Sequence, residues 1–155
     1  MATKTEWGNA VWYFFHTTAF KMRPESFEEL KNEYVNIIKS ICSILPCPDC
    51  LQHAMEETRS LDASNLKTKE DLNKYLISFH NKVNFRIKKP LYSSDYNEYI
   101  KQYSKAVTMN VWINFFNQMG KPYHNIRLIT NGFQKPIILK NIKEWLQKNK
   151  NKFMS

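Results

Sequence analysis

Apolar residues recur three and four positions apart along most of the chain, which is the spacing of one face of an α-helix. The pattern predicts a first helix over about residues 7–21. A second helix is expected after residues 26–29, whose sequence Ser-Phe-Glu-Glu is typical of a capping box. Residues 45–48, Leu-Pro-Cys-Pro, end the second helix, and Pro48 can occupy the first turn of a third, short helix that ends near Arg59.

Residues 68–71, Thr-Lys-Glu-Asp, predict the start of a fourth helix, and Pro90 closes it. Ser94 can cap a further helix, which the pattern extends as far as Met119. The apolar face of the fourth helix consists of Leu72, Tyr75, Leu76, Phe79 and Val83.

Residues 123–134 mix β-branched residues with turn formers, so a loop or a short strand is predicted there. Pro136 is expected to start a last amphipathic helix. Together the elements predict an all-α protein. A helical bundle with short connections would occupy residues 1–105, and a mostly helical extension would occupy residues 106–155.

The composition is that of a soluble globular chain. Its 155 residues suffice for one domain with its own core, and an aromatic share of 14% with only three glycines argues against disorder. No apolar run approaches the roughly 18 residues that a membrane span requires. The first nine residues lack the apolar core of a signal peptide.

The net charge of +9 is concentrated toward the C-terminus. Residues 1–90 hold 13 basic and 11 acidic side chains, whereas residues 91–155 hold 10 basic and 3 acidic ones. Lysine supplies 19 of the 23 basic residues. Arginine, the side chain that binds phosphate through two parallel hydrogen bonds, is therefore scarce. We therefore interpret the charge as a solvated helix face and do not expect a nucleic-acid partner.

Cys47 and Cys50 are the sharpest chemical feature of the sequence. Two cysteines three positions apart at a helix start can close a small disulfide, and the helix N-terminus stabilises the reactive thiolate. Spacing alone leaves three interpretations open: a dithiol redox centre, half of a zinc site that includes His53, and chance. Cys42 lies in the apolar second helix, where a buried and unreactive thiol is expected.

Two further groups of side chains share helix faces. His80 and Asn84 are four residues apart near the end of the fourth helix, and Lys88 continues the same row. Trp12 and His16 have the same spacing in the first helix. Each group alone is compatible with a polar helix face or an ordinary core. With the cysteine pair, they could surround one planar redox cofactor that carries phosphates.

These residues form three sequence blocks, through which about residues 5–105 resemble the Erv/ALR family of FAD-linked sulfhydryl oxidases, in particular its small members from large DNA viruses. Residues 92–103 are similar to the fifth helix of those viral members. The blocks are Trp7-Gly8 with Trp12 and His16, residues 46–50 (Pro-Cys-Pro-Asp-Cys) with His53, and residues 80–90 (His-Asn-Lys-Val-Asn-Phe-Arg-Ile-Lys-Lys-Pro).

The resemblance implies a four-helix bundle with a short fifth helix, FAD at one end, and thiol oxidation as the activity. A substrate thiolate would attack Cys47, and Cys50 would pass two electrons to FAD and then to O2, which yields H2O2. Trp12, His16 and His53 would surround the flavin, His80 would stack on the adenine, and no metal role is implied. The implied cofactor-binding residues are Gly8, Trp12, His16, Cys50, His53, His80, Asn81, Val83, Asn84, Lys88 and Lys89.

The resemblance also implies protein thiols as substrates and a homodimer formed through the first helices. For a viral member it implies the host cytoplasm at sites of virus assembly, or the virion. The chain lacks the second C-x-x-C that many members use as a shuttle, so direct oxidation or a thioredoxin-like carrier is expected. Leu45 stands where many members have a flavin-contacting tyrosine. The alternative function is a zinc-stabilised, non-enzymatic binding module built on Cys47, Cys50 and His53.

Overall fold

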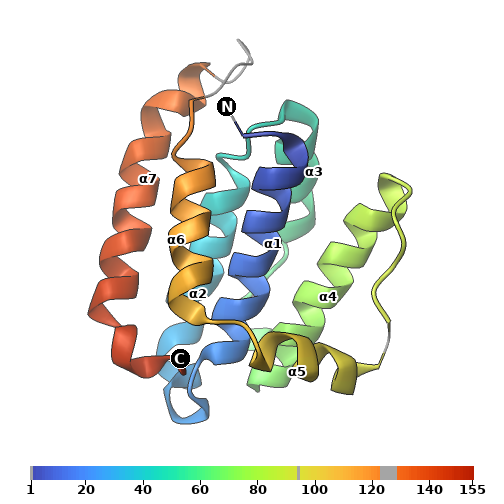
Figure 1. The fold of residues 1–155 in the computed structure, drawn as a ribbon, viewed down its shortest axis with the longest axis vertical. Coiled ribbons are helices and arrows are strands. Elements are labelled where there is room, and N and C mark those ends of the chain that lie inside the picture. Colours follow the sequence, from blue (N-terminus) through green and yellow to red (C-terminus); the bar gives the residue numbers. More distant parts are fainter. Residues whose placement is uncertain (1, 94, 123–128) are drawn as a thin grey trace.

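The computed structural model describes residues 2–93, 95–122 and 129–155, and these contain helices but no named strand (Figure 1). None of the described helices has the length and apolarity needed to cross a membrane. The predicted all-α class is confirmed. In chain order the helices are α1 (Lys4–Lys21), α2 (Phe27–Cys42), α3 (Pro48–Thr58), α4 (Lys69–Arg86), α5 (Tyr96–Ser104), α6 (Thr108–Met119) and α7 (Ile129–Lys148), with 3-10 turns at Pro24–Ser26, Ala63–Asn65 and Lys150–Lys152.

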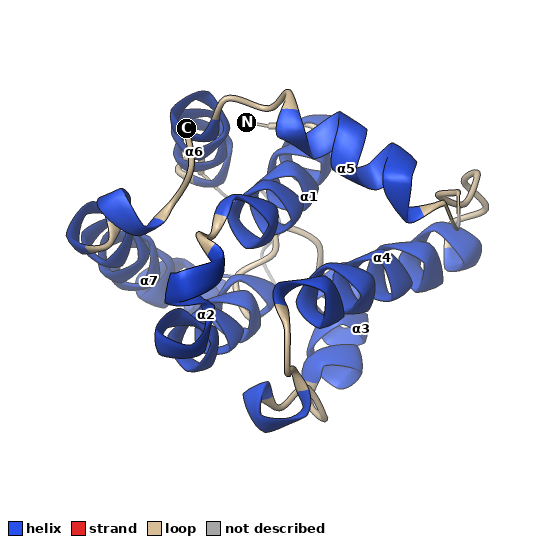
Figure 2. Ribbon diagram, turned by 90° about the horizontal axis from the view of Figure 1, so that it is seen from below, coloured by secondary structure: helices blue, strands red, loops and turns tan. Residues whose placement is uncertain are grey.

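The first helix, α1, is the centre of the molecule. It packs against α4, α5 and α6, while α2 packs against α3 and α7 (Figures 1 and 2). Phe14 and Phe15 are neighbours in the chain, yet both are buried, because α1 has packing partners on more than one side. Residues on the α4 side of α1, including Trp12, are thereby held against α4.

The start of α2 differs from the prediction. Pro24–Ser26 forms a 3-10 turn, so Ser26 has a helical backbone (φ −102°, ψ −7°) and its side chain makes no capping hydrogen bond. A capping hydroxyl reaches the N–H groups of the first turn from an extended backbone. The capping box predicted at residues 26–29 is therefore wrong.

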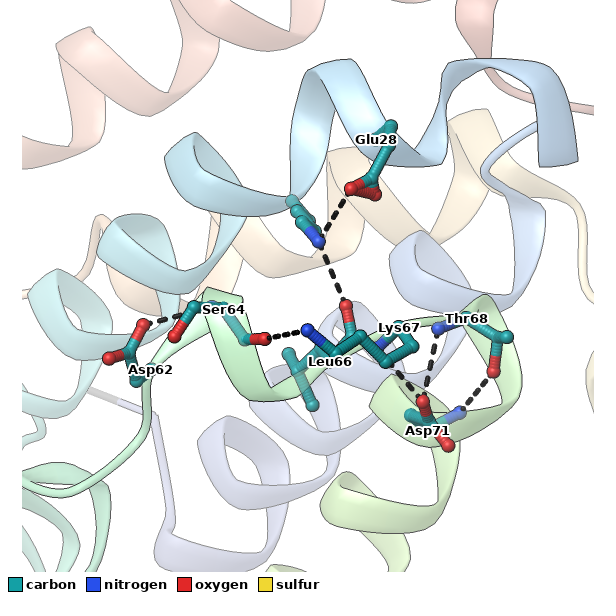
Figure 3. Close-up of polar contacts among 8 residues, drawn as sticks. Glu28, Asp62, Ser64, Leu66, Lys67, Thr68 and Asp71 are labelled. Atoms are coloured by element: carbon teal, nitrogen blue, oxygen red, sulfur yellow. Dashed lines mark hydrogen bonds and ion pairs between the residues drawn. The ribbon is translucent and has the colours of Figure 1, made fainter.

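The start of α4 confirms the prediction. Thr68 Oγ1 accepts a hydrogen bond from the Asp71 N–H at 3.1 Å, and Asp71 Oδ2 accepts one from the Thr68 N–H at 3.1 Å (Figure 3). Just before this capping box, Lys31 Nζ on α2 donates to the Leu66 carbonyl oxygen at 3.0 Å. The entry into α4 is thus tied to α2 as well as capped.

The segment predicted as one helix up to Met119 forms two helices. The carboxylate of Asp95 caps α5 by accepting from the Asn97 N–H at 2.9 Å, whereas the predicted cap, Ser94, lies outside the described residues. The chain turns after α5, and α6 then packs along α1. The turn allows Trp112 and Phe115 to be buried against α1, which a straight continuation of α5 would prevent.

The last helix begins before the predicted position. Residues 129–134 belong to α7, so the loop or strand predicted there is wrong for these residues, while residues 123–128 lie outside the described part. Pro136 lies inside α7 rather than at its start. An interior proline removes one backbone hydrogen bond and its ring crowds the carbonyl four residues earlier, which is why the sequence pattern favours a helix start at Pro136.

The C-terminal helices share the core of the bundle. The Phe115 ring of α6 stacks on Phe14 with centroids 4.2 Å apart, and Trp112 Nε1 donates to Thr18 Oγ1 at 3.0 Å. On α7, the Trp145 ring lies near-parallel to Tyr34 of α2, with centroids 6.2 Å apart. Residues 1–105 and 106–155 therefore bury apolar side chains against each other.

Candidate active site

A cavity of about 430 Å³ lies where α1, α3 and α4 meet the segment that follows α4. Its size is in the range of cavities that hold small molecules and cofactors. Aromatic and aliphatic side chains supply most of its wall. Seven of the residues predicted to bind the cofactor line it, namely Gly8, Trp12, Cys50, His80, Val83, Asn84 and Lys89.

The two cysteines differ in their position relative to this cavity. Cys50 lines it and Cys47 does not, although their sulfur atoms are only 2.6 Å apart and both are free thiols. Cys47 is the N-cap residue of α3, and its sulfur accepts a hydrogen bond from the Cys50 N–H at 3.3 Å. Cys50 is therefore the inner sulfur and Cys47 the outer one.

Burial sets the proton affinity of the inner thiol. It raises the pKa of Cys50 to about 11, helped by the hydrogen bond and charge of Cys47, while Lys4 and Arg86 act in the opposite direction. Burial also raises the pKa of Cys42 to about 12, against a smaller lowering by its hydrogen bond with Thr58. Cys42 is 1% exposed.

His80 forms part of the cavity wall and is held by its neighbours. Its ring stacks on the indole of Trp12 with centroids 3.9 Å apart and an angle of 4° between the planes. Its Nδ1 is 2.9 Å from Nε2 of His16. Burial, followed by the charge of Lys89, lowers the pKa of His80 to about 3, so the ring is neutral at pH 7.

His16 lies behind the cavity wall rather than in it. It is fully buried, and its Nδ1 is 2.8 Å from the hydroxyl of Tyr99 on α5. Burial, followed by the charge of His80, lowers its pKa well below the usual value. The structure thus joins the predicted residues His16 and His80 in one hydrogen-bonded chain, with Tyr99 as a member that the sequence analysis missed.

The charged residues in the cavity wall are all cations. Lys4, Arg86 and Lys89 contribute to the described wall, and no carboxylate does. Lys4 and Arg86 were not predicted. A sequence signal existed for both, because Lys4 precedes Gly8 by one helical turn and Arg86 follows Val83 by three residues on α4. A cavity with this wall suits a ligand that has a flat ring system and negative charges.

Besides His16, three further predicted cofactor residues do not line the cavity. His53 is exposed beside a separate hollow between α3 and α4. Asn81 Oδ1 accepts a hydrogen bond from the Tyr92 N–H at 2.8 Å, so this side chain positions the segment after α4. Lys88 has a φ of 62° in the turn that follows α4.

The structure does not bring Cys47, Cys50 and His53 together as the zinc site that the alternative function requires. Among the described residues, no group of three or more His, Cys, Asp or Glu side chains is arranged to hold a metal ion. The two sulfurs are adjacent, but His53 does not complete a group with them.

The fold and the site define a helical bundle with a dithiol pair beside an aromatic, cationic cavity. The Erv1/Alr family model matches residues 9–105, and the chain belongs to this family. This range contains all the site residues discussed above except Lys4 and Gly8.

The curated relatives carry names that agree with one another. The putative FAD-linked sulfhydryl oxidase 096R of Invertebrate iridescent virus 3 is 32% identical over 85 residues, which are 54% of this chain and 57% of the relative. The FAD-linked sulfhydryl oxidase of African swine fever virus (isolate Warthog/Namibia/Wart80/1980) is 27% identical over 105 residues, or 68% of this chain and 86% of the relative. The FAD-linked sulfhydryl oxidase ERV1 of Arabidopsis thaliana is 28% identical over 82 residues, 53% of this chain and 42% of the relative. No solved structure matches the chain.

Proposed function

We propose that the protein is an FAD-dependent sulfhydryl oxidase that forms disulfides in protein substrates. The observation that carries the proposal is the position of Cys50, the inner cysteine of a C-x-x-C pair, in the wall of an aromatic and cationic cavity. The match to the Erv1/Alr family and the names of its relatives support the same activity.

The cavity fits FAD in its chemistry. The stacked Trp12 and His80 provide flat surfaces for rings, and Asn84 provides an amide. Lys4, Arg86 and Lys89 provide positive charge for a diphosphate. When bound, FAD supplies two-electron redox chemistry that connects the Cys47–Cys50 dithiol with O2, the electrons ending in H2O2.

The protein's own part of the reaction is thiol–disulfide exchange. A substrate thiolate attacks Cys47 in the Cys47–Cys50 disulfide, forms a mixed disulfide and releases Cys50 as a thiolate in the cavity wall. Lys4 and Arg86 favour this thiolate through their charge. A second substrate thiolate then attacks the substrate sulfur of the mixed disulfide, which releases the oxidised substrate and leaves Cys47 reduced.

Partners and location are further parts of the proposal. The electron donor would be a protein thiol, reached directly or through a thioredoxin-like carrier, in the host cytoplasm at sites of virus assembly or in the virion. The expected homodimer would form through the first helices, α1 and α2. Since α6 packs on α1 and α7 packs on α2, the interface would use the surfaces of α1 and α2 that α6 and α7 leave free. Light scattering tests the dimer, and a mass of one chain would contradict it.

Spectroscopy and oxygen consumption test the activity. The purified protein should be yellow, and it should consume oxygen when a dithiol is added. Cys47→Ser and Cys50→Ser should each reduce oxygen consumption to background, whereas Cys42→Ala, which removes the thiol outside the C-x-x-C pair, should retain most of it. A protein that neither contains FAD nor binds it on reconstitution would refute the proposal.

A further inference from the structure

A chain of three side chains connects α5 to the cavity. The hydroxyl of Tyr99 is 2.8 Å from His16 Nδ1, and His16 Nε2 is 2.9 Å from His80 Nδ1. Tyr99 and His16 are buried, and His80 is 7% exposed. The remaining ring nitrogen, Nε2 of His80, has no hydrogen bond to any described residue, and His80 lines the cavity.

The direction of these hydrogen bonds follows from counting protons. Both rings are neutral at pH 7, so each carries one N–H. If the Tyr99 hydroxyl accepted a hydrogen bond from an N–H at His16 Nδ1, the hydroxyl's own buried hydrogen would have no acceptor among the described residues. The hydroxyl therefore donates to His16 Nδ1, and the proton of His16 is on Nε2. His16 then donates to Nδ1 of His80, which leaves the proton of His80 on Nε2.

We propose that Tyr99 and His16 are positioning residues that fix His80 in its Nε2–H tautomer, so that His80 donates a hydrogen bond to the ligand in the cavity. The ligand is FAD if the proposed function is correct, and its acceptor would be an oxygen or a ring nitrogen. The stacking of Trp12 on His80 fixes the plane of the ring, and His16 fixes its protonation.

The tautomer can be measured without the cofactor. The 15N shifts of the His80 ring in the full-length apo protein distinguish a protonated nitrogen from an unprotonated one. We expect a protonated Nε2 and an unprotonated Nδ1. Tyr99→Phe should shift His80 toward a mixture of tautomers, because it removes the donor that starts the chain. Tyr96→Phe is the matched control, since it removes the hydroxyl of a neighbouring α5 tyrosine that bonds Asn73 instead.

Two variants of His16 separate proton placement from packing. His16→Gln places an amide N–H donor near the position of Nε2. In His16→Asn the shorter side chain places its amide near the position of Nδ1, too far away to donate to His80. We expect His16→Gln to bind FAD nearly as well as the unmodified protein and His16→Asn to bind it roughly tenfold more weakly, which is the effect of about one hydrogen bond. Titration of the apo protein with FAD gives both affinities.

The possible outcomes separate this inference from the proposed function. A His80 ring with its proton on Nδ1, or equal losses of FAD affinity in His16→Gln and His16→Asn, would overturn the inference even if the protein is an oxidase. Absence of FAD binding by the unmodified protein, with the Nε2–H tautomer present, would overturn the proposed function and leave the positioning role of Tyr99 and His16 standing.

Discussion

At the scale of single residues, the three cysteines of the chain lie in three different environments. Cys42, Cys47 and Cys50 lie within nine positions of one another. Cys42 and Cys50 both contact the cavity, but Cys42 is 1% exposed whereas Cys50 is half-buried, and Cys47 lies at the outer end of the pair. Because the thiolate is the reactive form, burial and a raised pKa make a cysteine slow to react. The three thiols should therefore differ in reactivity.

Alkylation of the reduced protein measures this difference. We expect Cys47 to react first with iodoacetamide at pH 8, Cys50 to react more slowly, and Cys42 to react only after unfolding. The Cys50 rate should rise about tenfold per pH unit up to its pKa of about 11, because the thiolate fraction rises tenfold per unit below the pKa. Peptide mass spectrometry identifies the sites, and the denatured protein, in which all three react, is the control. Early labelling of Cys42 would contradict the assignment.

The buried histidines make stability depend on pH. The folded-state pKa values of His16 and His80 lie below the unfolded value, so the unfolded chain binds more protons than the folded one as the pH falls below about 6.5. The groups around them are Trp12, Tyr92, Tyr99 and Tyr103, together with the cation of Lys89. The free energy of unfolding should thus fall on acidification, by at most about 1.4 kcal/mol per pH unit for each histidine.

Urea unfolding of the apo protein at about pH 7, 6 and 5 tests this slope, above the range in which most carboxyl groups titrate. His16→Gln removes one of the two titrating groups, so its stability should depend less steeply on pH. A slope unchanged by this substitution would show that other groups cause the acid sensitivity.

At the scale of elements, helix starts depend on a local geometry that residue types alone do not determine. Residues 26–29 and 68–71 both have the composition of a capping box, but only Thr68 has the extended backbone (φ −135°, ψ 163°) that capping requires. A proline two positions before Ser26 instead initiates a 3-10 turn that runs into α2.

Replacing each hydroxyl by alanine distinguishes the two starts. Thr68→Ala should lower the free energy of unfolding by about 1 kcal/mol, the usual cost of losing an N-cap. Ser26→Ala, the matched control, should change it by less than about 0.5 kcal/mol, because its side chain makes no capping hydrogen bond. Equal effects in denaturant titrations would mean that Ser26 also caps α2 in solution.

At the scale of the whole molecule, the hydrophobic core extends further along the chain than the match to the family model does. The match ends at residue 105, whereas one apolar core includes Phe14 and Tyr34 together with Phe115, Trp145 and Phe153. The chain end is tied to the same core, since the Met154 N–H donates to the Lys21 carbonyl oxygen at 2.7 Å. The C-terminal helices should therefore unfold together with the bundle.

A substitution on α6 tests this cooperativity. Phe115→Ala should destabilise the whole protein by about 3–5 kcal/mol, because it leaves a cavity beside Phe14. Ile113→Ala on the same helix should cost far less, since Ile113 is 51% exposed. Circular dichroism and tryptophan fluorescence should report one common unfolding transition. Two separate transitions would show that residues 106–155 unfold independently.

The sequence by itself determined the helical class, through helical periodicity, and the C-x-x-C pair. Its resemblance to the Erv/ALR family also indicated seven of the residues that line the cavity, among them Trp12 and His80. The sequence did not determine the break between α5 and α6 or the early start of α7, since both depend on burial against α1 and α2. The role of His16 was also decided only by the tertiary structure. Its partners, Tyr99 and His80, are 83 and 64 positions away, and no local pattern reports a hydrogen bond between helices that far apart in the chain.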